Sequence, residues 1–110
     1  MLPDCPVEVT LIVLGDKWKV LIMRNLIREK KVRFNALKRS LVGISQKVLT
    51  QKLRDLEKLS IIERKVFAEI PPHVEYSLTE LGNSLITVIN AMAQWGEDHR
   101  KDLIHTLGKN

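Results

Sequence analysis

Cysteine is almost absent from this sequence, and its scarcity excludes several classes of protein. Cys5 is the single cysteine among 110 residues, so no disulfide can form within the chain. The three histidines, His73, His99 and His105, have no metal-ligand spacing, and the last two fall on different faces of a helix. We therefore expect no metal site and no other cofactor.

Long apolar runs and catalytic motifs are also lacking. No stretch approaches the roughly 18 apolar residues that a membrane span requires. Asp4 stands where a signal peptide has its basic n-region, and Glu8 interrupts the apolar stretch, so we expect no signal peptide. The sequence has no glycine-rich phosphate loop, no paired-carboxylate constellation and no recognisable Ser/His/Asp set. These absences predict a cytoplasmic protein with no membrane partner that is not an enzyme.

The residues that are present have the composition of a globular domain with uneven charge. The chain is 45% hydrophobic and 28% charged, with a net charge of +5, and its length fits one domain spanning 1–110. Residues 17–65 carry fifteen Lys or Arg against four Asp or Glu, a net charge of +11, whereas the remainder carries −6. Such a basic segment indicates a polyanionic partner, most often nucleic acid. A solvated lysine-rich surface is the alternative.

Apolar periodicity predicts a mainly α-helical protein. We expect helices over 6–14 and 17–29, a short helix that begins at Phe34, and another over 46–59 that is capped by Ser45. Residues 30–33 are expected to form a loop or a very short strand. Two helices joined by a short turn that contains Gly43 are the signature of a helix-turn-helix, here over about 34–59.

The apolar period changes from 3.6 to 2 after residue 61, which predicts a β-hairpin over about 61–78 with Pro71 and Pro72 at its tip. The alternating apolar positions are Ile62, Val66, Ala68 and Ile70 on the first strand and Val74, Tyr76 and Leu78 on the second. A hairpin that directly follows a helix-turn-helix is the wing of a winged helix.

A long helix is expected over 79–107, beginning after the N-cap Thr79. Its apolar positions recur at heptad spacing and exceed what one small domain can bury on itself. We therefore predict a homodimer formed through this helix and the helix over 6–14. The predicted interface residues are Leu11, Leu81, Leu85, Val88, Ile89, Met92 and Trp95.

Several short motifs, in order along the chain, resemble those of the HxlR-type winged-helix transcriptional regulators of bacteria, relatives of the MarR group. The matching segments from Cys5 to about Glu97 include Cys5-Pro6-Val7-Glu8, Lys17-Trp18-Lys19, Arg33-Phe34-Asn35, Ile44-Ser45-Gln46-Lys47, Pro71-Pro72 and Trp95-Gly96-Glu97. The resemblance implies a winged helix-turn-helix with an added N-terminal helix and a long C-terminal dimerisation helix. Asp16 and Ser60 stand where the family usually has glycine, and His73 where it usually has Arg or Lys.

The helix over 46–59 is the predicted DNA-reading element. Gln51 suits an adenine edge, Arg54 suits a guanine edge or a phosphate, and Ser45 lies where first-turn N–H groups can hold a phosphate. The complete set of predicted DNA contacts is Arg33, Ser45, Gln46, Lys47, Thr50, Gln51, Arg54, Lys58, Arg64, Lys65 and His73.

The predicted function is sequence-specific regulation of transcription by a nucleoid-associated homodimer that binds double-stranded DNA at a (pseudo)palindromic operator. The alternative is a winged helix that serves only as a protein-interaction module.

Cys5 has two interpretations. At the start of a helix the dipole and unpaired N–H groups favour a thiolate, and the resemblance implies a sensor for electrophiles or oxidants. It is otherwise a small packing or capping residue.

Overall fold

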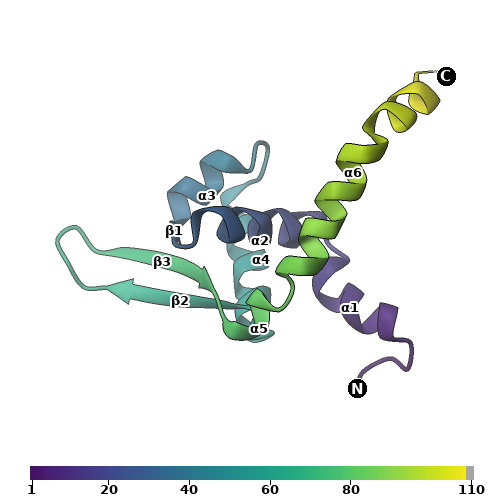
Figure 1. Ribbon diagram of the computed structural model, residues 1–110. Coiled ribbons are helices and arrows are strands. Elements are labelled where there is room, and N and C mark those ends of the chain that lie inside the picture. Colours follow the sequence, from purple (N-terminus) through teal and green to yellow (C-terminus); the bar gives the residue numbers. More distant parts are fainter. Residues whose placement is uncertain (109–110) are drawn as a thin grey trace.

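The computed structural model describes residues 1–108, in which a small helical body carries a protruding hairpin and two projecting helices (Figure 1). In chain order the elements are α1 (Pro6–Leu14), α2 (Lys17–Glu29), β1 (Val32–Arg33), α3 (Phe34–Ser40), α4 (Gln46–Lys58), β2 (Ile62–Phe67), β3 (His73–Leu78), α5 (Glu80–Asn83) and α6 (Ile86–Leu107). This architecture confirms the predicted fold class. None of the helices described is long and apolar enough to cross a membrane.

The core lies between α2, α4 and the base of the sheet. The largest fully buried side chains that α2 and α4 contribute are Ile22, Met23, Leu26, Leu49, Leu53 and Leu56. Ile62 and Tyr76 close the core from the sheet, and Ile89 enters it from the first turn of α6. Because Leu49, Leu53 and Leu56 recur at intervals of three and four residues, they place one face of α4 inward and leave the opposite face to solvent.

The sheet has three antiparallel strands in the order β1-β3-β2, so β1 extends the predicted hairpin. Val32 lies opposite Tyr76, and Phe67 lies opposite His73 at the far end. Of the two alternatives for residues 30–33, the structure has the short strand. It begins after Lys30, whose φ of 70° and ψ of −54° form a γ-turn in which the Lys31 N–H donates to the Glu29 carbonyl at 2.8 Å.

The apolar alternation that predicted the hairpin does not reflect burial along its whole length. Ile62 is buried, but Val66 is 59% exposed and Ile70 is fully exposed. Ala68 is also exposed, and β2 ends at Phe67. The predicted first strand therefore extends too far, since Ala68 and Ile70 lie beyond β2. The outer positions are exposed because the helical body ends at the base of the wing and the two strands continue into solvent (Figure 1).

The turn between α4 and β2 has a helix-ending geometry that normally uses glycine. The Ser60 N–H donates to the Glu57 carbonyl at 3.0 Å, and the Ile61 N–H donates to the Leu56 carbonyl at 3.0 Å. These two bonds define a Schellman motif, in which the residue after the cap is left-handed. Ser60 has that conformation, with φ 61°. The departure from glycine at this position therefore leaves the glycine-type turn intact.

A single helix over 79–107 is not what the structure shows. The chain forms the short helix α5, turns at Ser84 and Leu85, and then begins α6. Thr79 caps α5 by accepting from the Gly82 N–H at 3.0 Å, and Gly82 is packed so tightly that a Cβ there would clash with the Ile61 carbonyl. This contact holds α5 on the base of the wing, and the helix must break before α6 can leave the body.

Candidate nucleic-acid interface

Helix α4 begins with two local signals that fix its position after the turn from α3. Gly43 has a φ of +91°, which turns the chain, and the buried Ile44 donates its N–H to the Leu41 carbonyl at 3.1 Å. The Ser45 Oγ then accepts from the Val48 N–H at 3.1 Å. Because the hydroxyl acts as an acceptor there, its proton remains able to donate to a phosphate oxygen.

The predicted DNA-reading residues of α4 are brought together on one face. Thr50 is half-buried, and the exposed members of the set are Gln46, Lys47, Gln51, Arg54 and Lys58. They line a shallow groove along the outside of the helix, together with Asp55. Within residues 1–108 no ion pair engages Lys47, Arg54 or Lys58, so their charges are available to an external polyanion.

A second groove of about 570 Å³ lies between α4 and the wing. Gln46, Thr50 and Arg54 line it from the helix, and Arg64 lines it from β2. Arg64 was predicted from charge alone, and the structure places it in one groove with the predicted DNA-contact residues of α4. The wing and α4 can therefore contact one nucleic-acid strand together.

The outer wing positions its charged residues through stacking. The His73 ring stacks on Phe67 with 4.7 Å between centroids, and the Lys65 ammonium lies 5.2 Å from the Phe67 centroid. His73 Nε2 lies 3.0 Å from a Glu75 oxygen, and Nδ1 lies 3.9 Å from a Glu69 oxygen. The His73 side chain is only 14% exposed, so little of it is accessible for the DNA contact that was predicted for this residue.

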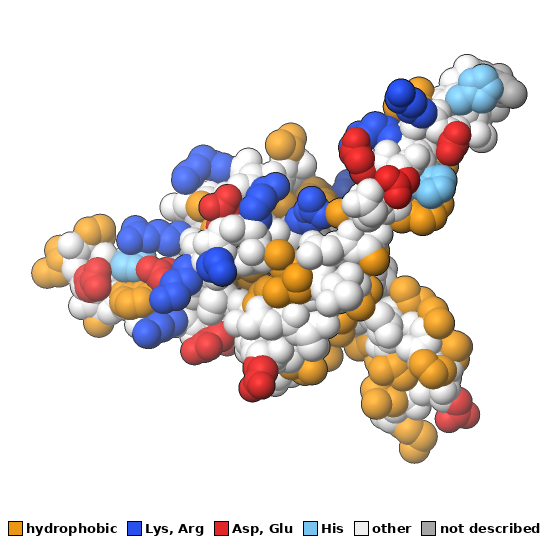
Figure 2. Space-filling view, viewed as in Figure 1, with side chains coloured by type: hydrophobic (Ala, Val, Ile, Leu, Met, Phe, Trp, Pro, Cys, Tyr) orange, Lys and Arg blue, Asp and Glu red, His pale blue; other side chains and the backbone are white. Residues whose placement is uncertain are grey.

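Arg33 belongs to a third, basic groove, which is lined by residues of β1, α3 and the wing tip. Lys31 and Arg39 line it together with Arg33, and Pro71 and Pro72 line it from the wing tip. The predicted contact set omitted Lys31 and Arg39. The run of cations over 30–33 was visible in the sequence, but its proximity to the wing tip depends on the pairing of β1 with β3. In Figure 2 the Lys and Arg side chains gather over α2, α3 and the base of the wing.

Two ion pairs join α4 to the start of α2. The Lys52 ammonium lies 2.6 Å from the Asp16 Oδ2, and the Lys19 ammonium lies 3.8 Å from the Asp55 Oδ2. Asp16 also caps α2 by accepting from the Lys19 N–H at 3.1 Å. Partial burial acts to raise the pKa of Asp16, but the hydrogen bonds from Lys52 and Lys19 and the Lys52 charge outweigh it, so that pKa lies below its usual value.

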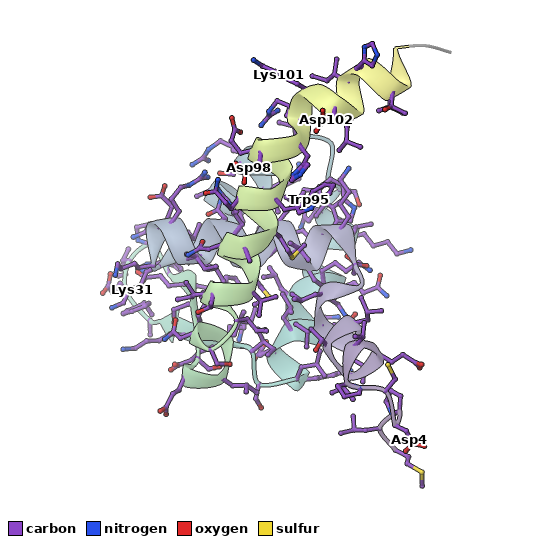
Figure 3. The ribbon with its side chains drawn as sticks, turned by 45° about the vertical axis from the view of Figure 1, so that its right-hand side comes forward. Asp4, Lys31, Trp95, Asp98, Lys101 and Asp102 are labelled. Carbon is purple, nitrogen blue, oxygen red and sulfur yellow. The ribbon has the colours of Figure 1, made fainter. Side chains whose placement is uncertain are left out.

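The projecting helices carry much exposed apolar surface. On α1 the exposed side chains include Val7, Leu11 and Ile12, and on α6 they include Val88, Met92, Trp95, Leu103, Ile104 and Leu107. Figure 3 shows Trp95 on α6, with Asp98, Lys101 and Asp102 on the part of that helix that extends past the body. Ile89 was predicted to contact a partner, but it is 1% exposed and packs in its own core, so that assignment is wrong.

Leu85 is half-buried against the same core, whereas Leu81 is 55% exposed.

Cys5 is the exposed N-cap residue of α1, and its sulfur caps no N–H of that helix. Within residues 1–108 no group of three His, Cys, Asp or Glu side chains is arranged to hold a metal ion.

Comparisons with known proteins agree with this geometry. Residues 13–103 match the model of the family described as HxlR-like helix-turn-helix. The HTH-type transcriptional regulator YybR of Bacillus subtilis (strain 168) is 44% identical over 106 residues, which cover 96% of this chain and 83% of YybR. YdeP of the same organism, another HTH-type transcriptional regulator, is 48% identical over 103 residues, which cover 94% of this chain and 79% of YdeP.

Solved structures show the same likeness. The redox regulator HypR in its reduced form has a TM-score of 0.85 and 44% identity, with 90% of this chain and 97% of that structure covered. Its oxidized form gives a TM-score of 0.81 and 46% identity, with 86% of this chain and 96% of that structure covered. The reduced form of the transcriptional regulator YodB from B. subtilis gives a TM-score of 0.74 and 36% identity, with 86% and 93% covered.

Proposed function

Because the chain belongs to the HxlR-like helix-turn-helix family of transcriptional regulators, we propose that it acts as a homodimer that binds DNA sequence-specifically. In this proposal α4 enters the major groove, and the wing lies along the phosphate backbone or the minor groove. The two-fold symmetry of the dimer then requires a (pseudo)palindromic operator whose half-sites are a whole number of helical turns apart. Its place of action is the nucleoid, in the cytoplasm.

The observation that carries this proposal is the exposed face of α4. It combines Gln51 and Arg54, whose side chains match base edges, with Lys47 and Lys58, which are free of ion pairs among the described residues. Arg64 extends the same surface onto the wing. A winged helix used only as a protein-interaction module has no need for such an uncompensated basic face, so this alternative explains the structure less well.

The exposed apolar residues of α1 and α6 support the dimer. Leu11 is 51% exposed, Met92 is 45% exposed and Trp95 is 56% exposed in the isolated protomer. Large apolar side chains at these levels of exposure on two projecting helices are typical of a protein–protein interface. A second copy of the chain is the simplest partner, since it supplies the same surface by symmetry.

The experiment that tests the function is selection of duplexes from a random pool, followed by affinity measurements on the selected and random sequences. Gln51→Ala and Arg54→Ala should each lose on the order of 1–3 kcal/mol of discrimination where the residue reads a base. Lys65→Ala is the control, because a lost phosphate contact weakens both duplexes alike. A specific-to-random ratio that stays unchanged in both α4 variants would show that α4 is not the reading element.

The same proposal includes a redox or electrophile response through Cys5. Two observations support it: the thiol is exposed at the start of α1, and the chain is similar to structures described as the oxidized and reduced forms of the redox regulator HypR. Diamide accepts the two electrons and two protons released when two Cys5 thiols join as a disulfide between protomers. Oxidation should change operator affinity at least several-fold in the wild type and leave Cys5→Ser unaffected. Equal responses in the two proteins would exclude Cys5 as the sensor.

A further inference from the structure

Asp16 uses both of its carboxylate oxygens to connect separate helices. Oδ1 accepts the Lys19 N–H at 3.1 Å, which caps α2, and Oδ2 accepts from the Lys52 ammonium of α4 at 2.6 Å. The Lys19 ammonium in turn lies 3.8 Å from Asp55, one turn further along α4. We call Asp16, Lys19, Lys52 and Asp55 the clamp.

The clamp is partly shielded from solvent. The side chains of Lys52 and Asp16 are 21% and 29% exposed, and that of Lys19 is 14% exposed. Hydrogen bonds from an ammonium to a carboxylate are short, roughly 2.7–2.9 Å, and the Lys52–Asp16 distance of 2.6 Å is slightly shorter still. This geometry separates the Asp16–Lys52 pair from the exposed ion pair of Arg100 with Glu97, whose side chains are 66% and 70% exposed.

The clamp residues of α4 lie next to the residues that we propose read DNA. Lys52 follows Gln51 directly, and Asp55 follows Arg54. Because the backbone hydrogen bonds make α4 a rigid rod, any rotation of α4 about its axis moves the clamp residues and the proposed DNA-reading residues together. The buried leucines decide which face of α4 is inward. The two ion pairs tie the flank of α4 to the start of α2, so they add a second restraint on the rotation of α4.

We propose that Asp16 and Lys52 are positioning residues for DNA recognition, which hold α4 at the rotation where Gln51 and Arg54 meet base edges. The inference rests on the proposed function, since it presupposes that α4 reads DNA.

Asp16→Asn is the most direct test, because asparagine is also a good N-cap residue and keeps the start of α2 intact. The substitution removes one negative charge, so general electrostatics predicts unchanged or tighter binding to every duplex. The clamp predicts the opposite for the selected operator, whose affinity should fall about 5- to 20-fold, an effect at or below the low end of what one hydrogen bond to a charged group contributes. Random duplex should bind with unchanged or higher affinity.

Lys52→Gln and Lys58→Gln form a matched pair, because each removes one positive charge from α4. Lys58 takes part in no ion pair within residues 1–108, whereas Lys52 is the partner of Asp16. Lys58→Gln removes a predicted phosphate contact and should weaken operator and random duplex alike, so that their affinity ratio stays unchanged. Lys52→Gln should lower that ratio by about 5- to 20-fold, as Asp16→Asn does, and the double variant Asp16→Asn/Lys52→Gln should bind the operator no more weakly than Lys52→Gln alone.

Each measurement is made below the unfolding temperature of the variant, as monitored by circular dichroism. Operator binding by Asp16→Asn that equals or exceeds the wild type overturns the proposal. An operator-to-random ratio that Lys52→Gln leaves as unchanged as Lys58→Gln does also overturns it, and this comparison decides alone if Asp16→Asn does not fold. A wild-type protein that prefers no selected duplex overturns the proposed function as well, which distinguishes that failure from failure of the clamp alone.

Discussion

At the residue scale, two side chains occupy backbone conformations that glycine adopts with less strain. Ser60 has φ 61° at the end of α4, and Lys30 has φ 70° in the γ-turn after α2. A side chain in the left-handed region costs roughly 1–2 kcal/mol relative to the right-handed helix. The hydrogen bonds of the Schellman motif, together with the burial of Ile61 beyond it, hold Ser60 in place.

Ser60→Gly should therefore stabilise the protein. The relief of strain exceeds the extra conformational entropy that glycine gives the unfolded chain, so we expect the free energy of unfolding to rise by about 0.5–1 kcal/mol. Urea denaturation measures the free energy of unfolding. Ser60→Ala is the control, because alanine keeps the Cβ and therefore does not relieve the left-handed strain. A lower unfolding free energy in the glycine variant would contradict the left-handed assignment.

Asp16 predicts a dependence of stability on pH. Its pKa is lowered in the folded protein, so folding favours the carboxylate over the protonated acid. The stabilisation is fully present above the unfolded-state pKa of about 3.9 and is lost as the pH falls through the lower folded-state value. Asp16→Asn should lose stability at neutral pH and show a shallower decline in acid than the wild type, measured by thermal unfolding between pH 7 and 2. Parallel pH profiles for the two proteins would refute this linkage.

At the element scale, α6 changes its environment within two residues. Ile89 is 1% exposed and packs in the core of its own protomer, whereas Val88 beside it is 40% exposed. The first turn of α6 therefore belongs to the body, while the exposed face of the same helix is available to a partner. This division was invisible in the heptad spacing, which treats both residues as part of one apolar surface.

Val88→Asp and Ile89→Asp should thus fail in different ways. A charge at Val88 should raise the dimer dissociation constant at least tenfold and leave each protomer folded, because it burdens only the interface. A charge at Ile89 should cost more than about 3 kcal/mol of folding stability, because it is buried without a partner. Analytical ultracentrifugation and circular dichroism separate the outcomes. A Val88→Asp protein that remains a dimer at low micromolar concentration would exclude this face of α6 from the interface.

Elements set by local signals could be predicted from the sequence, and elements set by distant contacts could not. Pro6, Asp16 and Ser45 mark the starts of α1, α2 and α4, and all three helices begin where predicted. The break between α5 and α6 depends on the contact of Gly82 with the carbonyl of Ile61, twenty-one residues earlier in the chain. Hydrophobic periodicity contains no record of such a contact.

The candidate site follows the same rule. The exposed face of α4 was predictable because a 3.6-residue period fixes which residues share it. The surroundings of His73 were not, since its stacking on Phe67 results from the register of β2 with β3. The proximity of Lys31 and Arg39 to the wing tip required the pairing of β1 with β3.

At the scale of the whole molecule, positive and negative charge are separated along the chain. Residues 17–65 carry +11 and form the body and the base of the wing, whereas the rest of the chain carries −6. In Figure 3 Asp4 lies beyond α1, and Asp98 and Asp102 lie on α6 away from Lys31. Phosphate neutralisation by the basic part should dominate the binding of any duplex.

Affinity for duplex DNA should accordingly fall steeply with salt. If each protomer of the dimer neutralises about three to five phosphates, the slope of log affinity against log salt concentration should be roughly −5 to −9. Fluorescence anisotropy across a salt series measures it for random duplex. A slope shallower than about −2 would mean that the basic body does not contact the phosphate backbone.

Because α6 is long, a small tilt of this helix moves its far end by a large distance. Its 22 residues extend about 33 Å from a base that adjoins α5, which Thr79 and Gly82 hold against Ile61. With one end anchored, a tilt of only about 5° displaces the other end by about 3 Å, close to the rise of one base pair. In a dimer held through its α6 helices, small changes in the angle between these helices would thus be amplified into base-pair-sized changes in the separation of the two α4 helices.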